Sequence, residues 1–373
     1  MVGLMAAGMI GIGRAETPVA SHDDSFSKEG LLKADVSTLK DTQLVAHPDA
    51  PLREDQNVLW CGTLQLAWNQ AIDLVGEKLR FIHQPREVDL LNLENFTDKD
   101  LDATSYVALA DFERNNVEDE IRAALEKTFH GAASPELIPE KPPHPGPDDF
   151  VAYAYLYKNL SFPQPFEEID RPLLFSGRST FVQDFGFFDR KNDLDRGVFS
   201  QVSIYDYKSR DDFIIKLKTK SPDDELILAK VPPALTLQAT MDDVLKRVTK
   251  NKPVTANSND ALAVPKLNFD LRKNFTELEG LILQPSPTAR IKSHLTVSEV
   301  KQLVRFQLNE KGAILKSEAT IVMTMSMVVA KPEPHIMIFD KPFLILMKQA
   351  KSDQPYFALW VGNASLLVPA ANP

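Results

Sequence analysis

The chain has 373 residues, of which 43% are hydrophobic and 25% charged, a composition typical of a globular protein with a sizeable core. Its formal net charge is −10, so we expect neither nucleic acid nor an anionic membrane surface as a partner. Cys61 is the only cysteine, which excludes an intrachain disulfide and any metal site built from several cysteines.

The N-terminal run from Val2 to Ile12 is apolar throughout and is followed by Gly13-Arg14-Ala15. The run is too short to span a bilayer, but it suits the apolar region and small-residue cleavage site of a signal peptide that lacks a basic start. We expect residues 1–15 to be a signal peptide and the protein to be secreted or periplasmic. The alternative is a cytosolic chain with a frayed apolar tip. Residues 16–50 are polar and predict a loosely packed tail with at most one short helix.

Apolar residues spaced by three and four predict a helix half buried against a core, formed around Leu64, Trp68, Ile72, Val75 and Leu79. A second helix is predicted from Val117 to His130, with Asn116 as its cap, acidic residues in its first turn and Gly131 at its end. Six prolines between 135 and 147 then exclude regular structure and indicate either an interdomain linker or a long surface loop.

Strand patterns dominate the rest of the chain, which predicts an α+β fold with its helices mainly in the N-terminal half. One further helix is predicted over 240–248, opened by Thr240 with Asp243 in capping-box position. The predicted strands cover residues 150–157, 201–207, 213–217, 226–231, 262–269, 304–308, 319–329, 343–347 and 357–361.

Patterns that carry enzyme chemistry are missing from the sequence. The seven histidines are scattered, and there is no glycine-rich phosphate loop, no HExxH and no GxSxG. Carboxylate pairs such as Asp223-Asp224 suit solvated turns better than a metal or glycosidase site. His335 stands between Pro334 and an apolar strand, where hydrogen bonding within a loop is the expected role. We therefore expect no enzyme activity, no metal site and no cofactor.

The segment from Ala313 to Val329 alternates in character: its odd positions are mostly apolar and its even positions mostly polar. Alternate side chains of a strand point to opposite faces, so the segment is able to form a strand with one apolar face. Gly312 precedes it as a flexible pivot, and Pro332 and Pro334 follow it and release the chain from any sheet. Two interpretations follow: a long strand permanently in a sheet, or a loop able to insert into one.

Several short motifs, in the same order along the chain, resemble the serpin superfamily. The motifs are Asn57-Val58-Leu59-Trp60, Tyr157-Lys158 with Gln164-Pro165-Phe166, Tyr205-Asp206-Tyr207-Lys208, Val264-Pro265-Lys266-Leu267, Asn309-Glu310-Lys311-Gly312, Phe339-Asp340-Lys341-Pro342-Phe343-Leu344 and Leu359-Trp360-Val361-Gly362. The resemblance spans about residues 57–362. It implies a single serpin-like domain over 51–373 with a large, mostly antiparallel central sheet, smaller sheets and a reactive loop at about 312–335.

The resemblance also implies roles for particular residues. The candidates for the reactive bond are Met325, Ser326 and Met327. The loop hinge corresponds to Glu310, Gly312, Ala313, Leu315, Ser317 and Ala319. The positions that control opening of the family's main sheet, called shutter and breach, correspond to Cys61, Tyr153, Phe162 and Gln302. Bulky or charged hinge residues, Leu315 among them, depart from the family pattern.

The function implied is that of a monomeric suicide-substrate inhibitor, whose loop is cleaved by a serine or cysteine protease and inserts into the main sheet. In that case the odd face of the loop would turn inward, and an apolar Met would favour chymotrypsin- or elastase-like targets. The alternative is a non-inhibitory serpin-like binding protein whose loop is displayed or permanently paired.

Overall fold

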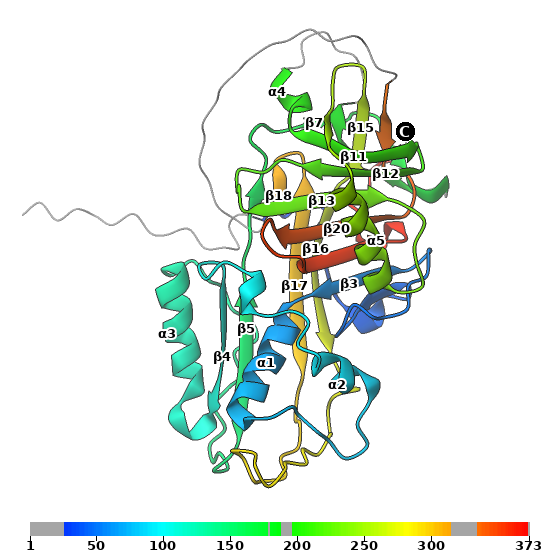
Figure 1. Ribbon diagram of the computed structural model, residues 1–373. Coiled ribbons are helices and arrows are strands. Elements are labelled where there is room, and N and C mark those ends of the chain that lie inside the picture. Colours follow the sequence, from blue (N-terminus) through cyan, green and yellow to red (C-terminus); the bar gives the residue numbers. More distant parts are fainter. Residues whose placement is uncertain (1–25, 178–179, 188–195, 315–333, 372–373) are drawn as a thin grey trace, which may run out of the picture.

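The computed structural model describes residues 26–177, 180–187, 196–314 and 334–371, and it consists mainly of β-sheets with helices packed around them (Figure 1). The largest sheet has eight strands, and every neighbouring pair is antiparallel except β2–β3. In order across the sheet, they are β14 (Val254–Thr255), β11 (Val202–Ser209), β12 (Asp212–Leu217), β13 (Asp224–Lys230), β20 (Phe343–Gln349), β21 (Pro355–Val361), β3 (Asn57–Cys61) and β2 (Thr42–Leu44).

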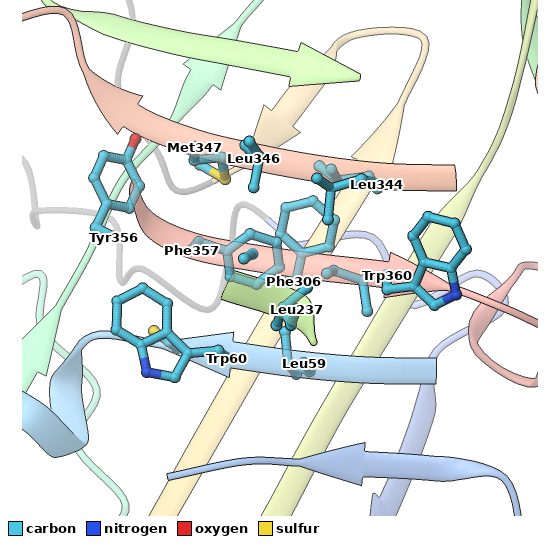
Figure 2. Close-up of a cluster of buried hydrophobic side chains, with 14 of the residues drawn as sticks. Leu59, Trp60, Leu237, Phe306, Leu344, Leu346, Met347, Tyr356, Phe357 and Trp360 are labelled. Carbon is cyan, nitrogen blue, oxygen red and sulfur yellow. The ribbon is translucent and has the colours of Figure 1, made fainter. Parts of the chain in front are cut away.

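The centre of this sheet is buried on both faces, which explains why β20 and β21 are nearly continuous apolar runs. Figure 2 shows the side chains that meet there. The Phe357 ring of β21 stacks on Phe306 from a neighbouring sheet, with ring centroids 4.6 Å apart. Trp360 is fully buried, and its indole N–H donates to the carbonyl of Glu54 over 3.3 Å.

A second sheet of five strands packs on the first through Phe306. Its order is β1 (Leu32–Asp35), β16 (Leu267–Asn274), β17 (Lys301–Asn309), β18 (Gly312–Ile314) and β6 (Leu160–Ser161). Only β1–β16 is a parallel pair. This sheet contains the first residues of the segment that the sequence marks as able to form a strand.

The antiparallel pair β4 (Tyr106–Phe112) and β5 (Phe150–Leu156) forms a separate two-stranded unit. The odd residues of β5 face α3 (Val117–Phe129) in a small apolar cluster, whereas its even residues face the main core, where α1 (Thr63–Val75) packs. Partly covered on both faces, β5 has the apolar and aromatic composition that the sequence shows.

A third sheet has the order β19 (Ile336–Ile338), β15 (Ala261–Pro265), β10 (Asp184–Phe187) and β7 (Glu167–Glu168). The chain between β7 and β10 forms a separate hairpin of β8 (Leu173–Leu174) and β9 (Phe181–Val182). The other helices are α2 (Arg86–Leu91), α4 (Arg196–Phe199) and α5 (Leu237–Lys250). No helix among the described residues is long and apolar enough to cross a membrane.

The predicted α+β class, with mostly antiparallel sheets and helices mainly in the N-terminal half, is confirmed. The helix predicted from residue 64 is α1 and ends at Val75, so that Leu79 packs into the core from beyond the helix. The predicted second helix is α3. Asn116 occupies its N-cap position, but its side chain makes no capping bond and instead accepts from Lys141.

Three expectations differ from the structure. The helix predicted to open at Thr240 begins one turn earlier, because Thr236 caps it by accepting from the Ala239 amide. The strand predicted over 262–269 is two strands, separated at Lys266. The tail predicted over 16–50 supplies β1 and β2 within its described part, because backbone pairing with β16 and β3 outweighs its polar composition.

A buried pair of carboxyl groups lies where α3 begins. Oε2 of Glu113 and both carboxyl oxygens of Glu118 are buried without a hydrogen-bond partner. Burial, followed by the adjacent Glu118 and by Asp149, raises the pKa of Glu113 to about 7. Glu113 therefore binds its proton more tightly when α3 is seated on β4 and β5.

Replacing Glu113 with Gln should stabilise the protein at pH 8 and change little at pH 4. Since the folded pKa lies above the unfolded value, the stability of the wild type relative to Glu113→Gln should fall as pH rises from about 4.5 to about 7. Urea denaturation across this range measures it, with the exposed Glu120→Gln as control. A difference in free energy of unfolding between wild type and Glu113→Gln that stays constant between pH 5 and pH 7 would contradict this prediction.

Candidate functional site at the two ends of segment 315–333

The strand β18 lies between two other strands. Its Gly312 pairs with Asn309 of β17 on one side and with Ser161 of β6 on the other. The amide of Phe162 donates to the carbonyl of Lys311 over 2.8 Å, and the amide of Phe166 donates to that of Glu310 over 2.8 Å. The beginning of the alternating segment is therefore already an inner strand of the second sheet.

Gly312 is required by the close approach of these strands. Its φ is 145°, a conformation that residues with side chains rarely adopt. A β-carbon at this position would lie 2.6 Å from the Cα of Ser161 and 2.7 Å from the carbonyl oxygen of Leu160. The predicted hinge glycine is thus the residue that lets β18 enter beside β6.

Ala313 fixes which face of the segment turns inward. It lies opposite Leu308 of β17 and Leu160 of β6, and all three side chains are fully buried. Side chains directly opposite one another in a sheet share a face. The odd face of the segment therefore begins on the core side at its first described member.

A buried lysine holds the turn before β18. The Nζ of Lys266 lies 3.0 Å from Oε2 of Glu310 and 2.5 Å from Oε1 of Glu168. Burial opposes the charged form of Lys266, but the bonds to Glu168 and Glu310 outweigh it and raise the pKa of this ammonium group. The predicted hinge residue Glu310 is therefore an anchor as well as a turn residue.

The chain after the segment is anchored at a second point. The fully buried carboxylate of Asp260 accepts from the backbone amide of His335 over 2.7 Å and contacts its Nδ1 at 2.9 Å. The hydroxyl of Tyr207 accepts from the Ile336 amide over 3.1 Å, and its ring meets the His335 ring edge to face. The loop hydrogen bonding predicted for His335 is confirmed.

Two of the four predicted shutter and breach residues meet. The side-chain amide of Gln302, in β17, donates to the carbonyl of Cys61 over 3.0 Å and to the Thr63 hydroxyl over 2.8 Å. This link joins the second sheet to the start of α1. Burial raises the pKa of the Cys61 thiol, so the thiol is kept neutral.

The other two lie apart from that link. Phe162 follows β6 directly and packs against Phe166 and Phe185, with ring centroids 4.9 and 6.1 Å away. Tyr153 points to the opposite face of β5 and joins the cluster under α3. The resemblance to the serpin family assigns all four residues to one region. Side chains alternate along β5, however, so Tyr153 points away from Gln302.

The remaining predicted site residues are outside the described part of the chain: Leu315, Ser317, Ala319, Met325, Ser326 and Met327. Sequence reasoning missed the roles of Lys266, Glu168 and Asp260. The sequence signal for Lys266 was its position as a single charged residue between the two apolar runs that form β15 and β16. Among the described residues, no group of three His, Cys, Asp or Glu side chains could hold a metal ion.

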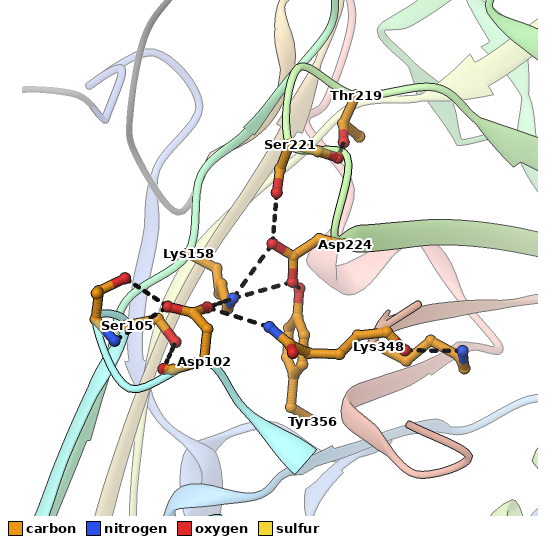
Figure 3. Close-up of polar contacts among 10 residues, drawn as sticks. Asp102, Ser105, Lys158, Thr219, Ser221, Asp224, Lys348 and Tyr356 are labelled. Carbon is orange, nitrogen blue, oxygen red and sulfur yellow. Dashed lines mark hydrogen bonds and ion pairs between the residues drawn. The ribbon is translucent and has the colours of Figure 1, made fainter. Parts of the chain in front are cut away.

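A second buried lysine connects β5 and β6 to the largest sheet (Figure 3). Lys158 bonds to Asp102 and lies 3.0 Å from Oδ1 of Asp224, which also accepts from the Tyr356 hydroxyl over 3.1 Å. Burial opposes ionisation of Asp102, but Lys158 and other donors lower its pKa to about 2. The side chains of Lys158 and Asp224 are 5% and 6% exposed, so each charge depends on the other.

No family model matches the chain, and no curated protein matches it. Among solved structures, it is similar to thyroxine-binding globulin in complex with thyroxine, with a TM-score of 0.46 and 13% identity over 83% of this chain and 93% of that one. A human thyroxine-binding globulin complex gives a TM-score of 0.45 and 12% identity over 83% and 92%. A serpin from Schistosoma mansoni gives 0.39 and 14% over 67% and 64%. Both proteins are members of the serpin family, which the sequence motifs resemble, and the likeness concerns the fold alone.

Replacing Gly312 with Ala should displace β18, because the new β-carbon meets the backbone of β6. Gly280→Ala is the matched control, since Gly280 also has a positive φ (75°) but nothing lies within 4 Å of its β-carbon position. We expect Gly312→Ala to lower the free energy of unfolding by about 1–3 kcal/mol more than the control. Equal losses in urea denaturation would contradict the close approach.

Replacing Lys158 with Met should cost about 3–5 kcal/mol, because it leaves Asp224 buried without a cation. Lys208→Met removes an exposed partner, 3.3 Å from Asp212, and should cost less than about 1 kcal/mol. Adding Asp224→Asn to Lys158→Met should recover part of the loss. A Lys158 variant as stable as the Lys208 variant would show that the buried pair contributes nothing.

Proposed function

We propose that this protein is a serpin-like inhibitor of a serine or cysteine protease that acts by inserting its cleaved loop beside β18. The observation that carries the proposal is β18 itself, a piece of the loop already paired on both sides with its odd residue inward. As part of the same proposal, the protein is an exported monomer and its partner is the target protease.

The register of β18 predicts where an inserted strand would lie. Continued along β6 and β5, it would bring Ser317 opposite Leu156, Ala319 opposite Ala154 and Met323 opposite Phe150. Continued along β17, it would bring Ala319 opposite Gln302. The two registers agree on the face, because the even residues of β5 and the residues Gln302, Val304 and Phe306 of β17 all face the core.

Among the described strands, the ladder partner of β5 is β4, and that of β17 at residues 301–304 is β16. An added strand would satisfy donors and acceptors on both edges at once, each bond contributing about 0.5–1.5 kcal/mol.

The side chains favour insertion as well. Burying Ile321 and Met323 would contribute roughly 3–6 kcal/mol, an upper value because the free loop already buries some area. Leu315 would meet Lys158 and Phe306 and cost about 1–3 kcal/mol in overpacking. The balance favours the inserted state.

The reach of the strand fits the candidate reactive bond. In this register Met323 lies opposite Phe150, the first residue of β5. Met323 is two residues before Met325, the candidate residue of the reactive bond. Attack by the protease nucleophile on the carbonyl carbon of Met325 would form an acyl-enzyme and release Ser326 as a new amino terminus. Insertion up to Met323 would then carry the attached protease to the far end of the sheet.

Cleavage of the loop should raise the melting temperature by roughly 10–20 °C, the shift expected for several kcal/mol in a domain of this size. Ile321→Glu should abolish the gain, since its charge would face the core, whereas Thr320→Glu, on the outward face, should retain it. Calorimetry before and after proteolysis of each variant measures the effect.

The alternative is a non-inhibitory binding protein with a displayed loop. No gain on cleavage, together with no SDS-stable complex with chymotrypsin- or elastase-like proteases, would favour that alternative and exclude inhibition by insertion.

A further inference from the structure

A short strap, residues 26–30, crosses two strands of the second sheet before β1 begins. The side-chain amide of Asn268, in β16, donates to the carbonyls of Ser27 and Glu29 over 3.0 and 2.7 Å. The backbone amide of Ser27 donates to Oε1 of Gln307, in β17, over 3.3 Å. Asn268 and Gln307 lie opposite one another in the ladder, so the strap bridges β16 and β17.

The strap reaches β17 on the face that points away from the core. The guanidinium carbon of Arg305 lies 4.4 Å from the centre of the Phe26 ring, a cation–π contact. Phe306 faces the core, so its neighbours Arg305 and Gln307 point to the opposite face. Gln307 pairs in turn with Ile314 of β18. The strap therefore holds the part of β17 on which β18 is paired.

The backbone of the strap is accessible. Residues 27–30 are exposed, and none of residues 26–30 belongs to a helix or strand. Proteases cut exposed segments that lack regular structure, and a trypsin-like protease cuts after a basic residue, here Lys28. Hydrolysis of the amide between Lys28 and Glu29 adds one water and leaves a carboxylate on Lys28 and an amino group on Glu29.

We propose that the strap is a brace on β17 and β18 that cleavage after Lys28 releases, so that proteolysis near the N-terminus loosens the strand pair from which the loop would insert. The inference rests on the proposed function, because it concerns regulation of the same strands. Phe26 and Ser27 supply both contacts with β17 and lie on the N-terminal side of the cut. Glu29 stays bound to Asn268 on the other side, so β16 keeps its own contact.

Hydrogen exchange at the amides of Gln307 and Ile314, which pair across the ladder, measures how often β17 and β18 separate. In the uncut protein, Phe26→Ala removes the cation–π contact and should lower the protection of both amides by roughly two- to fivefold. Amides in β12 and β13 should not change, because a local brace leaves the largest sheet as it was.

Arg305→Gln removes the other partner of the same contact. It should loosen the same pair of amides, and adding Phe26→Ala to it should have no further effect, because the contact is already lost. This variant also tests the inference if Phe26→Ala does not fold. Protection that is unchanged in both single variants, or effects that add in full, would overturn the brace.

Limited digestion with trypsin tests the release, with the cut identified by mass. Cleavage after Lys28 should lower the protection of Gln307 and Ile314 at least as much as Phe26→Ala does. Lys28→Ala is the matched control, since it should keep full protection before digestion and prevent the loss after it. No cut at this bond, or a cut that leaves the protection unchanged, would overturn the release.

The outcome is separable from that of the proposed function. Unchanged protection together with a melting gain on loop cleavage would overturn the brace alone. Loosening without that gain would support the brace and exclude insertion.

Discussion

The alternation of side chains from Phe150 to Leu160 runs without interruption from β5 into β6, and the rest of the candidate site depends on it. All even residues of this stretch face the main core, Lys158 included. The buried carboxylate of Asp224 and the partly exposed one of Asp102 hold that lysine, so a slip by one residue would expose Leu160 and place the ammonium group on the wrong face. The inward direction of Ala313 is a consequence of this fixed strand.

The two ends of segment 315–333 are anchored by different physics. The leading end is held by backbone pairing on two sides and by a lysine shared among carboxylates. The trailing end is held by one buried carboxylate, Asp260, which accepts from both the backbone and the ring of His335. Release of the first end changes sheet pairing, whereas the second stays attached to β15 through β19.

Much of this architecture could be predicted from local patterns. The 3.6-residue spacing predicted α1 and α3, and alternation or apolar runs predicted most strands, because those signals reflect burial on one or both faces. The polar residues 30–50 gave no such signal, because β1 and β2 are short strands that depend on pairing with partners far along the chain. Thr240 resembled a cap, but Thr236, one turn earlier, had the extended backbone that a cap needs.

The candidate site divides in the same way. Motifs singled out Glu310 and Gly312, which lie just before and at the start of β18, and Cys61 and Gln302, which are in contact. They did not predict the pairing of Lys266 with Glu168, because this contact joins residues 98 positions apart. Tyr153 shows why matching positions to a family motif is not enough. A shift of one residue along a strand moves a side chain to the opposite face of the sheet.

Because Ala313 faces the core, the odd positions that follow it would share that face in an inserted strand. This constrains how the length of the loop can change in evolution. In the proposed inserted strand, gain or loss of a single residue after Gly312 would exchange the two faces and turn Lys316, Glu318 and Thr320 toward the core. Gain or loss of two residues would preserve the faces of that proposed strand and only move the proposed reactive bond along the sheet. Lineages of such a loop should therefore differ in length by even numbers of residues near its start, while its outward side chains vary freely.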